Sequence, residues 1–205
     1  MPGLNLSTAL VIFAKAPVPG QVKTRLSPPL TPDEAATLHG SFVLDTLEWT
    51  KAAVGRLKLS MDRYLACSPS TTHVFFKIME ERQGVKLIEQ VGDDLGARMH
   101  QAIETMCLRG YRRTVLLGTD VPTLPFEYFK QALTLLDSHD LALGPALDGG
   151  YYLIGMNRSI PELFTNIPWS TDQVLKLTQD RAGQLGLKTA LLQPWRDVDT
   201  RADLE

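Results

Sequence analysis

The stretch Ala9-Leu10-Val11-Ile12-Phe13 is a continuous apolar run that leads directly into a basic loop ending at Leu26. Such a run, rich in residues that favour β-structure, is typical of a strand covered on both faces in a parallel sheet. We therefore expect the first central strand here. Ligands of open α/β sheets bind at the carboxyl ends of the strands, so the loop that follows is placed to contact one.

This loop combines three cations, spread over eleven residues, with residues that shape the backbone. The cations are Lys15, Lys23 and Arg25. Pro17 and Pro19 fix φ, whereas Gly20 lets the backbone approach a ligand closely. The loop can hold an anion such as a diphosphate. For a cation cluster taken alone, a solvated basic loop is the more common explanation, so at this point the two interpretations have about equal weight.

The composition bounds the class of protein. A chain of 205 residues with 44% hydrophobic and 21% charged residues can bury one sizeable core, so one domain over 1–205 is expected. The net charge of -2 gives no reason to expect nucleic acid or an anionic membrane as a partner. Cys67 and Cys107 lack the spacing of a disulfide scaffold or zinc site. Without a signal peptide or a long apolar run, we expect a cytoplasmic protein that spans no membrane.

Strand and helix patterns alternate along the chain, which predicts an α/β fold. Thr31 and Glu34 have the spacing of a capping box at a helix start. Ser170 and Gln173 repeat that spacing before a helix ending near Gly186. Further helices are expected over 95–106 and 126–136, with a helical or irregular stretch over 74–79 and a short helical tail. The later strands are expected over 57–66, 85–88, 114–117, 141–144, 189–192 and an antiparallel 151–154.

Three carboxylates follow predicted strands. Asp120 comes just after 114–117, a position that favours a metal ligand over a turn residue, because a turn needs no particular strand before it. Asp148-Gly149-Gly150 is a strong turn signal, and the same turn can place Asp148 in the predicted ligand-binding cleft at the carboxyl ends of the strands. Asp199 follows the last strand, where it either caps the helical tail or supplies a second metal-binding carboxylate.

The aromatic and histidine residues give weaker signals. Trp169 could stack on a substrate ring, but a single tryptophan beside a helix start is more often a core anchor. The four histidines show no metal-ligand or catalytic spacing; they are His39, His73, His100 and His139. His39 and His100 fall within predicted helices, which favours a packing or surface role.

Several familiar phosphate-binding and nucleophile motifs are missing. The stretch 20–24 is not a P-loop, because no glycine directly precedes Lys23 and no second glycine lies upstream at the required distance. No Gly-x-Gly-x-x-Gly follows the first strand, and no Gly-x-Ser-x-Gly elbow occurs. A cationic loop and two strand-end carboxylates remain. Two such carboxylates can hold Mg²⁺ or Mn²⁺, which together with the cations would offset the charge of a leaving diphosphate.

Four segments together resemble the small bacterial glycosyltransferase-A-like family, some of whose members are described as glycosyltransferases of arsenosugar biosynthesis. They are Phe13 to Leu26, Leu117 to Pro122, Leu143 to Tyr152 and Asp197 to Thr200. The resemblance covers nearly the whole chain. It implies the nucleotide-diphospho-sugar transferase (GT-A) fold, which is a three-layer α/β/α sandwich with a mostly parallel mixed sheet, and a nucleotide bound at the end of the first strand.

The second and fourth segments are also similar to the molybdenum-cofactor and related nucleotidyltransferases. In those proteins an aspartate of each motif helps to bind the metal, and this role carries over to Asp120 and Asp199. Two features differ. The usual Asp-x-Asp of glycosyltransferases is absent, since Thr119 precedes Asp120. The Gly-rich nucleotidyltransferase loop is replaced by 16–20, which favours sugar transfer over NTP activation.

The sequence thus favours a metal-assisted transferase with a nucleotide-diphosphate donor. The main prediction for its reaction is glycosyl transfer from a nucleotide sugar to an unidentified acceptor. Nucleotidyl transfer from an NTP to a phosphorylated acceptor, with pyrophosphate release, is the alternative, and a non-catalytic nucleotide-binding module is the third reading. Asp148 is expected to contact the sugar or act as general base. The expected diphosphate-binding residues are Ala14, Lys15, Gly20, Lys23 and Arg25. The expected metal ligands are Asp120 and Asp199. The expected substrate contacts are Gly149, Gly150, Tyr151 and Trp169. The oligomeric state stays open.

Overall fold

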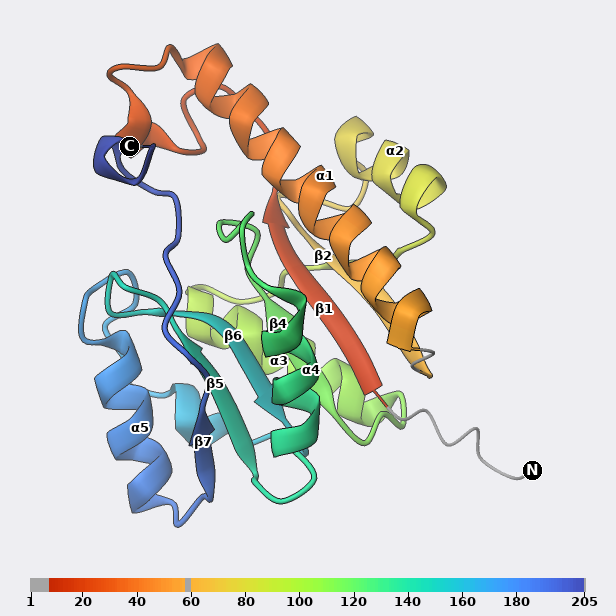
Figure 1. Ribbon diagram of the computed structural model, residues 1–205, viewed down its shortest axis with the longest axis vertical. Coiled ribbons are helices and arrows are strands. Elements are labelled where there is room, and N and C mark those ends of the chain that lie inside the picture. The colour runs from red at the N-terminus through yellow and green to blue at the C-terminus, as the bar shows by residue number, and fades with distance from the viewer. Residues whose placement is uncertain (1–7, 58–59, 205) are drawn as a thin grey trace.

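The computed structural model describes residues 8–57 and 60–204, which form one seven-stranded sheet between two layers of helices (Figure 1). The strands are β1 (Thr8–Lys15), β2 (Met61–Ser68), β3 (Lys86–Glu89), β4 (Thr114–Leu117), β5 (Leu141–Pro145), β6 (Tyr151–Met156) and β7 (Thr189–Leu191). The helices are α1 (Pro32–Leu57), α2 (Val74–Gln83), α3 (Leu95–Leu108), α4 (Phe126–Leu135) and α5 (Val174–Gln184). This is the predicted mostly parallel α/β architecture.

The first strand is the centre of the core, because its side chains alternate between the two helical layers. Leu10 and Ile12 are fully buried and belong to the cluster formed by α1, α2 and α4. Ala9 and Val11 are also fully buried, but they belong to the cluster formed by α3 and α5. Burying a side chain of leucine or isoleucine size contributes about 1.5–3 kcal/mol. The continuous apolar run therefore reflects a strand covered on both faces.

The strand order places a topological switch point between β1 and β4. The order is β3-β2-β1-β4-β6-β5-β7, so the chain moves from β1 outward to β3 and then returns to the other side of β1. The neighbours of β1 are both parallel to it, whereas β6 runs antiparallel to β4 and β5 as predicted. Loops diverge from the sheet at such a point and leave a crevice at the carboxyl ends of the strands.

The predicted capping box at the start of α1 is confirmed. Thr31 N donates to Glu34 Oε2 at 2.8 Å, and Glu34 N donates to Thr31 Oγ1 at 3.3 Å. The prediction for β2 began too early, since α1 continues to Leu57 and β2 begins at Met61. Residues 58 and 59 lie outside the described part of the chain.

The second capping box is wrong. Ser170 has the left-handed φ of 65°, and Thr171 Oγ1 donates back to Pro168 O at 2.8 Å. These residues therefore form a turn, and α5 begins only at Val174, without a side-chain cap from Gln173. In the helical tail, Asp203 rather than Asp199 accepts the backbone N–H of Thr200, at 2.7 Å. No helix within the described residues is both long and apolar enough to cross a membrane.

Candidate functional site

A cleft of ≈ 980 Å³ lies at the switch point, over the carboxyl ends of β1 and β4. The basic loop after β1 lines one part of it. Another part is lined by Asp148, Gly150 and Tyr151 and by the C-terminal residues Asp197 and Asp199. Residues distant in sequence therefore meet around one cavity. The predicted site residues that line it are Ala14, Lys15, Lys23, Arg25, Asp120, Asp148, Gly150, Tyr151, Trp169 and Asp199.

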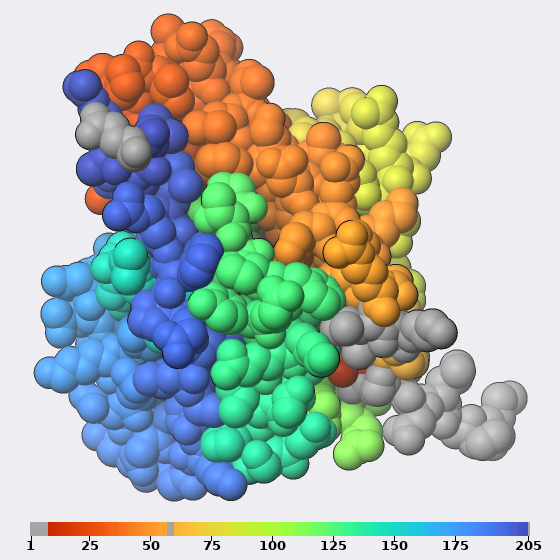
Figure 2. Space-filling view, in the orientation of Figure 1, coloured from red at the N-terminus to blue at the C-terminus, as the bar shows by residue number. Residues whose placement is uncertain are grey.

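The C-terminal segment, defined here as residues 193–200, joins the two halves of the cleft. Leu147 N donates to Trp195 O at 3.2 Å, and Val198 N donates to Asp120 O at 2.9 Å. The segment therefore leaves the β5 side of the sheet and crosses the end of β4. It runs along the front surface between the N-terminal part of the molecule and α5 (Figure 2). This crossing brings Asp197 and Asp199 to the cleft.

Lys23 is the internal cation of the site. Its side chain is only 4% exposed, and Nζ lies 2.5 Å from Asp120 Oδ1 and 2.7 Å from Asp199 Oδ1. Nζ also donates to Val198 O at 2.7 Å. The two aspartates predicted as metal ligands therefore share one lysine, and their metal role stays a prediction. Lys23 ties the basic loop to the C-terminal segment.

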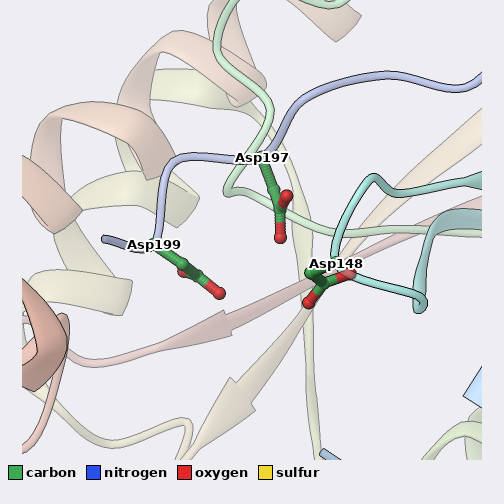
Figure 3. A group of neighbouring side chains, drawn as sticks. All are labelled: Asp148, Asp197 and Asp199. Atoms are coloured by element: carbon green, nitrogen blue, oxygen red, sulfur yellow. The ribbon is translucent and has the colours of Figure 1, made fainter. Parts of the chain in front are cut away.

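A second group of carboxylates lies beside that ion pair. One carboxylate oxygen from each of Asp148, Asp197 and Asp199 lies within 4.8 Å of the others, and the three side chains face a common space (Figure 3). Burial raises the pKa of Asp197 to about 6, and the negative charges of Asp148 and Asp199 add to this effect. Hard oxygen donors at this spacing fit Mg²⁺ or Mn²⁺.

The two remaining cations of the loop differ from Lys23. Lys15 and Arg25 are exposed, both line the cleft, and no ion pair is recorded for either within the described part of the chain. Their charges are thus available to an anionic ligand. Gly20 has a φ of 77° and does not line the cleft, so its predicted contact with a diphosphate has no direct support in the geometry.

The Asp148 turn is tightly fixed. Gly150 N donates to Asp148 Oδ1 at 2.9 Å, and Leu175 N donates to Gly149 O at 2.8 Å. Gly149 has a φ of 90°, and a Cβ there would lie 2.2 Å from Asp172 O. Gly149 therefore acts by allowing close backbone packing rather than by lining the cleft. The turn holds the Asp148 carboxylate at the end of the β5–β6 hairpin.

Trp169 is a core anchor that also reaches the cleft. Its ring stacks on Phe164 with centroids 6.4 Å apart and an interplanar angle of 27°. It also covers Gly96, where a Cβ would lie 2.3 Å from a ring atom. Tyr151 packs against the same hydrophobic cluster, and its hydroxyl donates to Met99 Sδ at 3.9 Å. Both rings are therefore held in fixed positions in the wall of the cleft.

Three residues that line the cleft were not predicted from the sequence as site residues. His39 is 5% exposed, and its Nε2–H donates to Lys15 O at 3.0 Å. Burial lowers its pKa. Ala35, His39 and Phe42 have the spacing of residues on one face of a helix, and the apolar character of the other two could have indicated this position. Asp197 is two residues from Asp199, and alternate residues of an extended segment share a side. Gln90 Nε2 donates to Ala14 O at 3.1 Å and to Ala66 O at 2.8 Å, which no sequence signal indicated.

Comparison with known proteins identifies relatives of two kinds. A 2-phospho-L-lactate guanylyltransferase from Methanothermobacter thermautotrophicus is 27% identical over 129 residues, which are 62% of this chain. The aligned region is only 53% of that protein's length. A candidate nucleotide-diphospho-sugar transferase from Desulfovibrio desulfuricans G20 is 36% identical, with a TM-score of 0.85 over 96% of this chain and 84% of that one.

The fold recurs in proteins with much lower identity. The inositol-1-phosphate CTP transferase from T. maritima has a TM-score of 0.58 at 14% identity, over 98% of this chain and 92% of that one. Residues 52–171, more than half of the chain, match the profile of a bacterial protein family. The chain therefore belongs to the family described as "uncharacterized protein conserved in bacteria (DUF2064)", within the nucleotide-diphospho-sugar transferase superfamily.

Proposed function

We propose that this protein is a metal-assisted nucleotidyltransferase, which transfers an NMP group from an NTP to an acceptor oxygen and releases pyrophosphate. The observation that carries the proposal is the opposition of charges in the cleft. The exposed Lys15 and Arg25 lie in the basic loop, and Asp148, Asp197 and Asp199 lie within 4.8 Å of one another in the same cleft. A triphosphate and a divalent cation need these two kinds of partner.

The comparisons favour nucleotidyl transfer over the glycosyl transfer that the sequence favoured. The curated relative is a guanylyltransferase, and a solved structure with the same fold is a CTP transferase. The proposal also explains the position of the basic loop, because the switch point of an α/β sheet is the usual place for a nucleotide.

The chemistry assigns separate roles to the two walls. Lys15 and Arg25 bind the β- and γ-phosphates, where charge increases as pyrophosphate leaves. Asp197 and Asp199 would hold the cation, which would neutralise charge on the phosphates. The acceptor oxygen forms a bond to the α-phosphorus while the bond from that phosphorus to the pyrophosphate oxygen breaks. The acceptor's proton passes to a cleft carboxylate, for which Asp148 is the exposed candidate.

Glycosyl transfer is the second candidate, and the 36% identical relative supports it, because that protein is described as a nucleotide-diphospho-sugar transferase. The same residues would then bind the diphosphate of a nucleotide sugar, and the sugar would occupy the space near Asp148. The two candidates share the donor-binding half of the cleft and differ in which bond breaks.

Calorimetric titration distinguishes these functions. GTP, CTP, UTP, ATP and the corresponding nucleotide sugars are titrated with Mg²⁺, with Mn²⁺ and with EDTA. We expect at least one NTP to bind in a metal-dependent way, and Lys15→Ala and Arg25→Ala to weaken that binding roughly tenfold each. Lys130→Ala, which removes an exposed lysine of α4, is the control. Tighter binding of nucleotide sugars than of NTPs would support glycosyl transfer. Failure of every nucleotide to bind would refute both candidates.

A further inference from the structure

Both residues proposed to hold the cation stand on the C-terminal segment, which contains no helix or strand of its own. Side chains on such a segment keep their positions only through the contacts of the segment with its surroundings. Asp199 is tied to Lys23, but within the described chain no hydrogen bond or ion pair ties the Asp197 carboxylate to another residue. The position of Asp197 therefore depends on what anchors the backbone beside it.

Trp195 is the side chain that anchors this part of the segment. Its neighbours Pro194 and Arg196 are exposed, whereas Trp195 is partly buried against the cluster formed by α1, α2 and α4. Its Nε1–H donates to Thr123 Oγ1 at 3.1 Å, in the loop that follows β4. Its ring packs edge-on against Tyr128 of α4, with centroids 5.4 Å apart and an interplanar angle of 80°. Figure 2 shows the segment lying against the region of α4.

The backbone of Trp195 pairs with the strand that leads to the Asp148 turn. Trp195 N donates to Pro145 O at 2.9 Å, and Leu147 N donates to Trp195 O at 3.2 Å. Asp148 directly follows Leu147, and Asp197 lies two residues after Trp195. The side chain and the backbone of one residue thus join the loop after β4, the Asp148 turn and the segment that carries the proposed metal ligands.

From these contacts we propose that Trp195 is a positioning residue, which sets the place of Asp197 and Asp199 relative to Asp148. The inference rests on the proposed function, because it concerns the spacing between the metal ligands and the proton acceptor of that reaction. Trp195 does not line the cleft, so it acts through the segment and not by touching the nucleotide. Residues that hold metal ligands in place typically contribute roughly 10- to 100-fold to metal affinity.

The first measurement is Mn²⁺ binding to the full chain without nucleotide, followed by electron paramagnetic resonance. Trp195→Ala should weaken Mn²⁺ binding roughly tenfold. Trp195→Phe keeps a ring against Tyr128 and loses only the hydrogen bond of Nε1, so it should weaken Mn²⁺ binding by no more than about threefold.

Trp49→Ala is the matched control. Trp49 is also partly buried against the cluster formed by α1, α2 and α4, and its ring packs edge-on against Phe126 and Phe129 at centroid distances of 6.2 and 5.9 Å. It lies on α1 and has no part in the C-terminal segment. Its replacement should lower the free energy of unfolding and leave Mn²⁺ affinity unchanged, which separates positioning from a general loss of stability.

The second measurement is the kinetics of pyrophosphate release at saturating Mn²⁺. The phosphates are bound by Lys15 and Arg25 of the basic loop, so Trp195→Ala should leave the KM for the NTP within about twofold. The kcat should fall roughly tenfold or more, because the cation and the proton acceptor are no longer held at the productive distance. Unchanged Mn²⁺ affinity and kcat in folded Trp195→Ala, or an equal loss of Mn²⁺ affinity in Trp49→Ala, would overturn the proposal.

A smaller pair of changes keeps the test decisive if Trp195→Ala does not fold. Trp195→Phe and Thr123→Val remove the two ends of one hydrogen bond. Each should weaken Mn²⁺ binding, and the double variant should weaken it no further than the single variants, since the same interaction is lost. Unaltered Mn²⁺ binding in both single variants would contradict the positioning role.

The two proposals fail in different ways. Binding of Mn²⁺ and of NTP to the unaltered protein is measured first, and its absence would refute the proposed function. Normal binding by the unaltered protein, together with unchanged binding and kcat in the Trp195 variants, would leave the proposed function intact and refute only the positioning role.

Discussion

The basic and acidic walls of the cleft are built in opposite ways. The basic wall comes from one stretch of eleven residues, Lys15 to Arg25, at the end of one strand. The acidic wall is assembled from the β5–β6 turn and the C-terminal segment, which lie about fifty residues apart in sequence. Lys23 connects the two walls through Asp120 and Asp199. Residues of the basic wall can be replaced without affecting the fold, because they come from one local stretch. The acidic wall depends on the fold, because its residues come from distant segments.

The largest expected effect comes from the acidic wall. Asp199→Asn removes a carboxylate shared by Lys23 and the three-aspartate group, so turnover should fall roughly 10²- to 10³-fold. Pyrophosphate release measures turnover, and the electron paramagnetic resonance of Mn²⁺ measures metal binding. Asp45→Asn, on the exposed surface of α1, is the control. Full activity in Asp199→Asn would exclude a metal role for the three aspartates.

The Asp148 turn gives the next largest effect, and it is an effect on stability. Gly149→Ala forces an alanine to a φ of 90° and places its Cβ 2.2 Å from Asp172 O, which should cost about 2–4 kcal/mol. Gly110→Ala has the same φ of 90° but open space around its Cβ, so it should cost only about 1–2 kcal/mol. Denaturant unfolding compares them. Equal losses would show that backbone strain alone acts at Gly149.

The bridge between the walls is tested by Lys23→Met. It leaves Asp120 and Asp199 without their shared cation, and we expect the unfolding free energy to fall by roughly 1–3 kcal/mol. Mn²⁺ should then bind more tightly, because the metal no longer competes with the ammonium group. Titration with Mn²⁺ measures this change, with Lys130→Met as the control. Weaker Mn²⁺ binding would mean that Lys23 holds the carboxylates in position for the metal and does not compete with the metal for them.

The smallest effect concerns the pH dependence of stability. Burial lowers the pKa of His39, so the unfolded chain binds the proton more readily than the folded one. The contribution of a neutral His39 is therefore present above the unfolded pKa of about 6.5. It is lost as the pH falls through the lower folded pKa. His39→Gln keeps a donor for Lys15 O and should flatten this part of the profile of unfolding free energy against pH. An unchanged profile would contradict the assignment to His39.

The sequence predicted those elements whose signal is local. The first strand, the capping box of α1 and the antiparallel β6 were confirmed because periodicity and turn residues act over a few positions. The start of α5 was wrong because Ser170 and Gln173 have the spacing of a capping box, but Ser170 adopts a left-handed conformation in the turn before the helix. Local spacing does not show whether a serine caps a helix or forms part of the turn before it.

The sequence by itself determined the order of strands and helices, the fold class and the basic loop after β1, since each depends on neighbouring residues. Only the tertiary structure decided that Lys23 is buried between Asp120 and Asp199, and that Asp197 joins Asp148. These contacts span long sequence separations and depend on the crossing of the C-terminal segment over the end of β4. The physical reason is that the interaction energy of two charges depends on the distance between them. For residues far apart in sequence, that distance is set only once the sheet has formed.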